Sequence, residues 1–473
     1  MTQKCVIDIH CHWFNIKFPI KELTVASWNM IRGNYPHQGM ERKAEVVRIY
    51  RKREESTIAR YAKWVASIAK TLVSSSDQNY KRMEDAFHKS SLGHERTIKM
   101  VPLMMDLYYS LHDNSDEETK GVPRRGTRSF QVEPFEVRGD HSQDFSDHVE
   151  KIRQTVLNAM ADGQKTMRGA KREIANDQIS EIFDQVKSEL QQAKRIKRSE
   201  DQYQGIELSP GFIDQMHDLE KIRKKNPGQV FPFLAVDPRR LGILELIQMK
   251  VNKEKGPFFG IKLYTPLGYL PTHPSLAPIF KYCEDEAIPI TAHTSLGGVK
   301  NFCNKIYVSS KEPGYGKCFS KVNKSKLFAD PDNWIPVLEQ WKELHLNLAH
   351  FGGGDRFTSP HNDWREKITK LLKNPQYPNV FTDISYFTKE SSAADVTNFL
   401  IKNPDLKKRL LFGTDFVMIA LDRKLGGLHQ YFSNFDGMVN EILYQNAIDF
   451  LAAPAVTSAQ KKISVKGNAN PRR

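Results

Sequence analysis

The chain has 473 residues, a formal net charge of +14 and five cysteines. This length exceeds an ordinary single-core domain but suits one large α/β barrel that carries additional helices. The cysteines are odd in number and have no CxxC spacing, which argues against a disulfide framework and against a structural zinc cluster. No run approaches the ~18 apolar residues that span a bilayer, and the N-terminus has no signal-peptide pattern. We therefore expect a cytoplasmic protein without a membrane partner.

The positive charge has two possible explanations. Basic residues alternate with acidic ones along the expected helices, which favours solvated helix faces, with nucleic acid as the alternative partner. The C-terminal tail, residues 456–473, differs because it is basic and has no apolar periodicity. We expect this tail to be disordered and to follow a single domain that spans residues 1–455.

Eight short apolar runs, rich in β-branched and aromatic residues, recur along the chain, most of them next to segments with helical periodicity. They are Cys5–Trp13, Ile98–Tyr109, Val230–Asp237, Phe258–Tyr264, Ile288–His293, Leu346–His350, Val380–Tyr386 and Leu410–Phe416. Nearly continuous apolar strands separated by helices are typical of a parallel sheet buried on both faces, and eight of them suggest closure. The sequence therefore predicts a (β/α)8 TIM barrel.

Three segments between the strands have recognisable patterns. Gly211–Lys225 and Asn333–Leu344 are expected to be helices, the first ended by Asn-Pro-Gly and the second preceded by Asp-Pro-Asp. The lysine-rich segment Lys300–Lys326 follows the fifth strand and is expected to be a loop, either solvated or attracting an acidic substrate.

Two connections are too long for simple loops between a strand and a helix. They cover about residues 15–95 and 110–209, and the first contains a helical stretch from about Gly39 to Val73. In the second, apolar residues recur at helical spacing in two successive runs, which predicts an antiparallel helical hairpin; the residues are Val149, Ile152, Val156 and Met160, then Ile179, Ile182, Val186, Leu190 and Ala193. A third stretch, Gly121–Glu136, is expected to be a flexible loop.

Both insertions follow strands and so should emerge on the face where a barrel builds its active site. They are candidate lids, dimerisation arms, or docking surfaces for a protein or nucleic acid.

The first strand ends with two histidines, His10 and His12, separated by one residue. Because successive strand side chains alternate between faces, the two histidines point the same way and Cys11 points elsewhere. This spacing suits chelation of one metal ion, although paired histidines on a strand are also found simply facing solvent. Cys11 is expected to be a small core residue.

Polar residues also stand at the ends of several later strands. They are Lys262, His293, His350 and Asp415. Any one of them has a plain structural explanation, such as a hydrogen-bonded cap. Together with His10 and His12, the residues His293 and Asp415 would converge at the barrel mouth as a nitrogen and oxygen donor set suited to Zn²⁺ or another divalent metal.

These motifs, in this order, resemble the amidohydrolase superfamily, specifically the amidohydrolase-related branch that includes aminocarboxymuconate semialdehyde decarboxylase and related hydrolases, lactonases and hydratases. The resemblance rests on seven stretches and covers most of the barrel. They are Asp8–His12, Gly260–Leu263, Ala292–Thr294, Asn333–Gly353, Thr382–Ser385, Gly413–Asp415 and Asn446-Ala447. Because this superfamily places many reactions on one site, the motifs name no substrate.

The resemblance implies that His10, His12 and His293 bind the metal and that Asp415 is a ligand, a proton acceptor, or both. It gives His350 two alternative roles: a catalytic base beside one metal, or a ligand to a second metal. The metal would be Zn²⁺, with Mn²⁺ as the alternative. It would activate water, with a histidine or an aspartate taking the proton.

Lys262 bears on the number of metals. Binuclear superfamily members carry a carboxylated lysine on the fourth strand, whereas relatives with one metal have a lysine that holds a substrate carboxylate as a point charge. We favour the second role and one metal per chain, with two metals if Lys262 is carboxylated.

Three further residues are candidates for smaller roles. Tyr264 and Asp106 lie at the ends of strands and could bind substrate, or could equally make loop hydrogen bonds. Asp383, on the seventh strand, is expected to orient a metal-binding histidine.

The resulting hypothesis is a metal-dependent hydrolase of a small amide, ester or lactone that bears a carboxylate, in a protein that forms homo-oligomers by analogy with the family. One alternative is a non-oxidative decarboxylase or hydratase of the same branch. Another is a barrel that acts as a component of a larger protein or nucleic-acid assembly.

Overall fold

The computed structural model describes residues 4–13, 15–32, 44–68, 74–112, 142–163, 169–192, 203, 205–206, 208–253, 255–308, 318–320, 323–421 and 427–451. The expected flexible loop 121–136 and the basic tail 456–473 lie outside these residues. Within them, no helix combines the length and the apolar character needed to cross a bilayer.

The centre of the molecule is a parallel sheet. Six strands are hydrogen-bonded in the order β10 (Leu410–Leu411), β9 (Val380–Asp383), β8 (Leu346–Ala349), β5 (Ile290–His293), β4 (Gly260–Leu263) and β3 (Phe233–Val236). A separate parallel pair is formed by β1 (Lys4–Cys11) and β2 (Arg96–Pro102). The predicted parallel α/β architecture is confirmed, and each of the eight predicted strands overlaps with one of these strands.

Backbone contacts join the β1–β2 pair to both edges of the larger sheet. On one side, the Ile9 amide donates to the Phe412 carbonyl at 3.0 Å, just after β10. On the other side, Leu103 forms a parallel bridge with Phe233 of β3. The pair therefore lies between the two outer strands of the six-stranded sheet.

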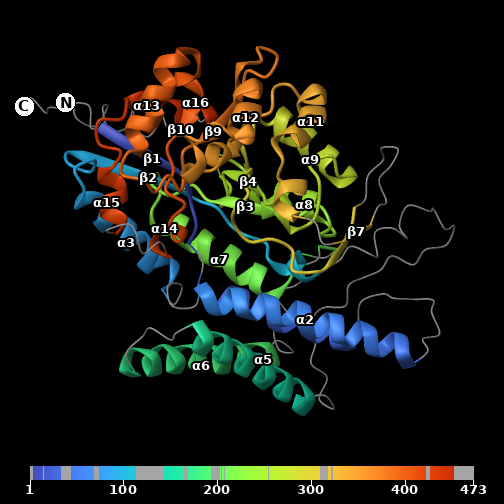
Figure 1. Ribbon diagram of the computed structural model, residues 1–473. Coiled ribbons are helices and arrows are strands. Elements are labelled where there is room, and N and C mark those ends of the chain that lie inside the picture. Colours follow the sequence, from blue (N-terminus) through green and yellow to red (C-terminus); the bar gives the residue numbers. More distant parts are fainter. Residues whose placement is uncertain are drawn as a thin grey trace, which may run out of the picture.

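The sheet is strongly curved. Phe450, from the last helix α16 (Asn446–Leu451), packs its ring against Phe233 of β3 and against Phe381 of β9, with centroid separations of 6.3 and 5.6 Å. These two strands are four steps apart in the sheet order, so only a curved sheet can bring both to one ring. The apolar core within the curve is therefore closed at one end by α16 (Figure 1).

Helices surround the sheet on its outer side (Figure 1). They are α8 (Ile243–Lys250), α9 (Ala277–Asp285), α11 (Ile335–Gln340), α12 (Asp363–Lys373), α13 (Ser392–Lys402), α14 (Met418–Leu421) and α15 (Leu428–Ser433). Short 3-10 turns precede or follow several of them, as at η1 (Tyr108–Leu111), and the π-helical turn Glu441–Gln445 leads into α16.

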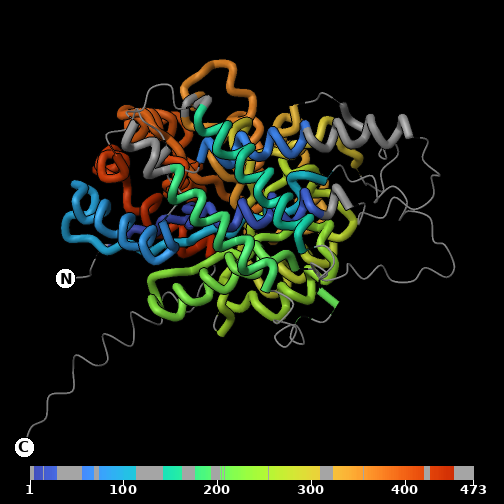
Figure 2. The backbone as a smooth tube through the Cα atoms, turned by 90° about the horizontal axis from the view of Figure 1, so that it is seen from below, coloured from blue at the N-terminus to red at the C-terminus, as the bar shows by residue number. Residues whose placement is uncertain are grey.

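The long connections are helical. Between β1 and β2 lie α1 (Lys17–Arg32), α2 (Ala44–Ile68) and α3 (Ser76–His88); between β2 and β3 lie α5 (Ser142–Gly163), α6 (Gly169–Gln192) and α7 (Pro210–Lys225). Helix α2 packs on α5, and the α5–α6 pair forms an outer layer below α2 and α7 (Figures 1 and 2).

Helices α5 and α6 form the predicted antiparallel hairpin. Gln191 bonds to Ser146, and Arg153 pairs with Asp184. Partner numbers rise on one helix as they fall on the other, which is the antiparallel arrangement. The predicted apolar residues of α5 are buried against α6, α1 and α2, and Ile179, Val186 and Leu190 of α6 are also buried. Ile182 is half-buried, and Ala193 lies outside the described residues.

Several predicted boundaries were wrong. The strands are shorter than expected, because the chain turns away from the sheet once the polar residues of the site are reached. The helix expected at Asn333–Leu344 is a 3-10 turn, Pro331–Trp334, followed by α11, which ends at Gln340. The expected loop 300–326 contains a small antiparallel hairpin of β6 (Lys305–Tyr307) and β7 (Cys318–Ser320), and then α10 (Lys324–Phe328).

Candidate metal centre

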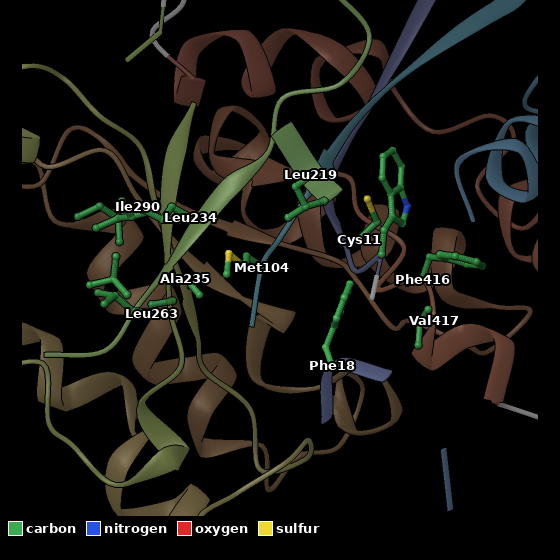
Figure 3. Close-up of a cluster of buried hydrophobic side chains, with 14 of the residues drawn as sticks. Cys11, Phe18, Met104, Leu219, Leu234, Ala235, Leu263, Ile290, Phe416 and Val417 are labelled. Carbon is green, nitrogen blue, oxygen red and sulfur yellow. The ribbon is translucent and has the colours of Figure 1, made fainter. Parts of the chain in front are cut away.

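The carboxyl ends of the central strands bring the candidate residues together. His10 lies in β1 and His12 directly follows it, His293 ends β5, His350 follows β8 and Asp415 follows β10. All five are buried, with side chains that are at most partly reached by solvent. Cys11 points away into the apolar cluster that includes Met104 and Phe416, so its prediction as a core residue is confirmed (Figure 3).

The hydrogen bonds of His10 and His12 define which ring nitrogen of each carries the proton. His10 Nδ1 lies 2.9 Å from the Asp383 carboxylate, and His12 Nδ1 lies 2.8 Å from the Leu103 carbonyl. Both partners accept hydrogen bonds, so each Nδ1 carries the proton and each Nε2 carries a lone pair. Burial, with a further contribution from Lys262, lowers the pKa of each ring to about 3, so both are neutral.

These two lone pairs face each other. The Nε2 atoms of His10 and His12 are 3.3 Å apart, and neither has a proton to share. The Oδ1 atom of Asp415 lies 3.7 Å from the first and 3.4 Å from the second. Three potential electron-pair donors thus converge in a buried space, which is unfavourable unless a cation or a proton lies among them. Burial accordingly raises the pKa of the Asp415 carboxyl well above its usual range.

The donor set fits a divalent metal. Two imidazoles and one carboxylate are ligands that Zn²⁺ and neighbouring transition metals accept, and each histidine has its other nitrogen bonded to an orienting acceptor, as metal-binding histidines generally do. Among the described residues, two groups of three have donor atoms within 4.8 Å of one another: His10, His12 and Asp415, and His10, His350 and Asp383.

Asp383 belongs to the hydrogen-bonding framework of the site. Its two oxygens accept from five donors: His10 Nδ1, the Asn347 amide group, the backbone amides of His350 and Ser385, and the Ser385 hydroxyl. Burial opposes ionisation, but the attraction of His10 and these hydrogen bonds outweigh it and hold the pKa of Asp383 well below its usual range. With its oxygens occupied, Asp383 has the geometry of an orienting carboxylate.

A second pair of histidines adjoins the first. His350 Nε2 lies 3.1 Å from His293 Nδ1, and its own Nδ1 lies 2.8 Å from the Ser385 hydroxyl. Burial and the neighbouring His10 lower the pKa of His350 to about 3. The His350 ring is therefore neutral, and its Nε2 is directed into the site.

The backbone is strained at the two candidate catalytic residues. His350 has φ 72° and Asp415 has φ 57°, in the left-handed region that non-glycine residues seldom adopt. Such conformations persist only where surrounding structure enforces them, and they cluster at active sites. Here the enforcing contacts are the His350 amide on Asp383 and the Asp415 amide on the His10 carbonyl.

His293 takes a different position from the other predicted ligands. Its Nε2 lies 3.1 Å from the Gly297 carbonyl, and its ring stacks on Tyr264 with centroids 4.4 Å apart. It is absent from the groups within ligand distance of one another in the described chain. The structure thus places His293 against His350, and its role as a metal ligand remains a prediction.

Tyr264 lies within the site, whereas Asp106 is held elsewhere. The Tyr264 ring packs on His293, and the fit is so close that a Cβ on Gly298 would stand 2.2 Å from its hydroxyl. Both Asp106 oxygens accept from the Arg240 guanidinium at 2.8–2.9 Å, with the pair fully buried. This arrangement favours the structural reading of Asp106 over the substrate-binding one.

Lys262 is a buried cation of the site, and its Nζ lies 5.8 Å from the centroid of the Tyr264 ring. Its side chain is 1% exposed, and its Nζ has no hydrogen-bond partner among the described residues. Burial lowers its pKa to about 8, although Asp383 and Asp415 act in the opposite direction. A buried ammonium without a partner is costly, so an anionic group bound beside it would be strongly stabilised.

Two members of this network, Ser385 and Asn347, are not predicted from the sequence. Ser385 and Asn347 both bond to Asp383. Ser385 stands two residues after Asp383, on the same face of an extended segment, and Asn347 is a polar residue within an apolar strand. These two sequence positions suggest that Ser385 and Asn347 are polar residues near the site. Neither position shows which residue the side chain would contact.

The family model for amidohydrolases matches residues 192–452, which is more than half of the chain. The chain belongs to the amidohydrolase family. The predicted resemblance is confirmed, and the protein is an enzyme of the amidohydrolase type. The matched segment contains Lys262, His293, His350 and Asp415, while His10 and His12 lie before it.

Three solved structures illustrate the similarity. A 5-carboxyvanillate decarboxylase from Sphingomonas paucimobilis is 12% identical, with 51% of this chain and 72% of that chain covered and a TM-score of 0.32. A probable 2-pyrone-4,6-dicarboxylic acid hydrolase from Acinetobacter baumannii is 14% identical, covering 50% and 78%, with a TM-score of 0.34. The IDCase of Metarhizium anisopliae is 18% identical, covering 50% and 67%, with a TM-score of 0.30. No curated protein matches the chain significantly.

Proposed function

We propose that this amidohydrolase binds one divalent metal, Zn²⁺ or alternatively Mn²⁺, through His10, His12 and Asp415, with His293 as a further ligand. We propose that it hydrolyses a small amide, ester or lactone that bears a carboxylate. The observation that carries the proposal is the buried convergence of the His10 and His12 lone pairs, 3.3 Å apart, on the Asp415 carboxylate. When bound, the metal supplies Lewis acidity and water activation.

The residues of the chain have separate tasks in this proposal. His350 presents a neutral Nε2 toward the site and takes a proton there as general base. Asp383 holds His10 through Nδ1 and holds the backbone of His350 through its amide. The close packing of Tyr264 on His293 excludes water from one side of the centre.

Lys262 is the basis for proposing a carboxylate on the substrate. Its Nζ is buried and unpaired next to the metal-binding residues. An ammonium in this setting binds a carboxylate as a charge-assisted hydrogen-bond donor. The alternative, a carboxylated Lys262 between two metals, would bring His350 into the ligand set.

We also propose that the eight strands close into a (β/α)8 barrel with the insertions as lids. The backbone contacts of β1 with the end of β10 and of β2 with β3 support closure. Helix α2 reaches the loop after β5, where Arg60 donates to the Phe302 carbonyl at 2.9 Å and Trp64 packs on the Phe302 ring. Because the site residues are buried, substrate entry requires this cover to move.

Elemental analysis tests the proposal directly. Wild-type protein is expected to contain one zinc or manganese per chain, and the His10→Ala, His12→Ala double variant is expected to contain none. A matched control is His345→Ala, which removes a half-buried histidine that bonds to the Phe450 carbonyl outside the site. Failure of wild-type protein to bind metal even after reconstitution with Zn²⁺ or Mn²⁺ would refute the proposal.

A second candidate reaction is non-oxidative decarboxylation in the same site. It is favoured by the position of Lys262, which would hold a substrate carboxylate beside the reactive centre. Screening carboxylated amides, esters, lactones and aromatic acids for both hydrolysis and CO₂ release separates the two reactions. The homo-oligomeric state, a cytoplasmic location, and a protein or nucleic-acid partner for the helical insertions remain predictions.

A further inference from the structure

The Ser385 hydroxyl lies between the Asp383 carboxylate and the His350 ring. Its Oγ is 2.5 Å from Asp383 Oδ1, 2.8 Å from His350 Nδ1 and 3.3 Å from His10 Nδ1. The side chain is fully buried. A hydroxyl has only one proton to donate, so these contacts fix where the protons of its neighbours lie.

The proton of Ser385 goes to Asp383. The carboxylate accepts four other hydrogen bonds and is ionised, so it has no proton to give. Two oxygen atoms 2.5 Å apart repel unless a proton lies between them, and only the hydroxyl can provide it. The Ser385 oxygen is then left with lone pairs alone.

The proton of His350 follows from this assignment. A neutral imidazole carries one N–H, and its Nδ1 faces a serine oxygen that can only accept. We propose that Ser385 is a positioning residue that holds His350 as the tautomer with its proton on Nδ1, leaving the Nε2 lone pair directed into the site. The use of that lone pair as a base rests on the proposed function, whereas the tautomer does not.

The Asp383 carboxylate thereby fixes the proton position on both the His10 ring and the His350 ring. Asp383 Oδ2 bonds directly to His10 Nδ1, and Asp383 Oδ1 reaches His350 through the Ser385 hydroxyl. His293 Nε2 donates to the Gly297 carbonyl, so its Nδ1 carries a lone pair that faces His350 Nε2 at 3.1 Å. This contact alone would favour a proton on His350 Nε2, but it is longer than the 2.8 Å contact of His350 Nδ1 with Ser385. The inner face of the site is consequently lined by lone pairs.

Nitrogen NMR of the full chain, labelled with ¹⁵N-histidine, tests the assignment. Long-range nitrogen–proton correlation distinguishes a protonated ring nitrogen from one with a lone pair, and His350→Gln identifies the resonance. We expect Nδ1 of His350 to be protonated in wild-type protein, both free of metal and loaded with Zn²⁺. The metal-free sample separates the effect of Ser385 from any effect of coordination at Nε2.

The variant Ser385→Ala removes the hydroxyl acceptor but leaves the Ser385 backbone carbonyl, which also interacts with His350. Its His350 resonance is expected to show a larger population with the proton on Nε2 than wild-type protein does. Ser385→Thr retains the hydroxyl and should restore the wild-type tautomer. Ser392→Ala is the matched control, because it removes another buried hydroxyl that bonds to the Phe387 carbonyl. It should leave the His350 tautomer unchanged.

Two outcomes would overturn the proposal. One is a proton on Nε2 of His350 in wild-type protein, which decides the question even if the alanine variant does not fold. The other is an unchanged Nδ1–H tautomer in folded Ser385→Ala. Metal content and substrate turnover do not enter these readouts, so a failure of the proposed function remains distinguishable from a failure of this inference.

Discussion

His10 and Asp383 form a 2.9 Å hydrogen bond that joins the first strand to β9 across 373 residues of chain. The bond places the His10 proton on Nδ1 and turns Nε2 toward His12. This single contact connects the framework of the site to its metal-binding face. The two ends of this bond therefore have different roles: His10 would bind the metal, and Asp383 would only orient His10.

The first prediction compares His293→Ala with Asp383→Asn. If His293 completes the metal site, its removal should abolish metal binding and activity together. Asp383→Asn should leave metal largely bound but lower affinity or activity by about 10- to 100-fold, because it removes no proposed metal ligand and disturbs the orientation of His10 and His350. Metal titration of both variants gives the answer, and equal loss of metal in the two would contradict the division of roles.

The second prediction concerns the chemical state of Lys262. By mass spectrometry, we expect a single metal per chain and no carbon dioxide adduct on Lys262. Lys262→Met should raise the KM for a carboxylate-bearing substrate by about 10- to 100-fold, because a hydrogen bond to a charged group is lost. Lys250→Met is a matched control, since Lys250 pairs with Glu220 on helix α7, away from the site residues. Two metals together with an adduct would establish the binuclear site instead.

The third prediction separates the two readings of Asp106. Removing one partner of a buried ion pair leaves the other charge uncompensated, at a cost of about 3–5 kcal/mol. Asp106→Ala should therefore destabilise the protein through Arg240, with little change in KM for molecules that remain folded. Urea unfolding and steady-state kinetics measure the two effects. A large rise in KM at nearly unchanged stability would restore the substrate-binding role.

The fourth prediction is acid sensitivity of the contact between the two insertions. His148 of α5 lies 2.9 Å from the Ser27 hydroxyl of α1, and burial lowers its pKa from 6.5 to about 4. Between these values the unfolded chain binds more protons than the folded one, so stability rises with pH and falls on acidification. The contribution is present above pH 6.5 and lost as the pH falls toward 4.

The difference between wild type and His148→Gln isolates this contribution from other buried histidines. Between pH 7 and pH 5, wild type should lose about 2 kcal/mol more unfolding free energy than the variant. Urea denaturation at a series of pH values measures the difference. Parallel pH profiles for the two proteins would show that His148 titrates normally in the folded state.

Much of the fold was predictable because its signals are local. Apolar runs identified all eight strands, and helical spacing at Val149, Ile152 and Val156 identified the α5–α6 hairpin. The ends of the elements were less predictable. The helix expected to reach Leu344 stops at Gln340, and a hairpin interrupts the expected loop 300–326, because packing against distant segments decides where an element ends.

The sequence by itself determined the chemical inventory of the site: two histidines at strand spacing, polar residues at the ends of later strands, and a lysine among them. Tertiary structure alone decided the pairings. It committed Asp106 to Arg240 and brought Ser385 between Asp383 and His350. The reason is physical: periodicity along a strand fixes the direction of a side chain, whereas its protonation state and hydrogen-bond partner depend on atoms that other elements of the fold bring close to it.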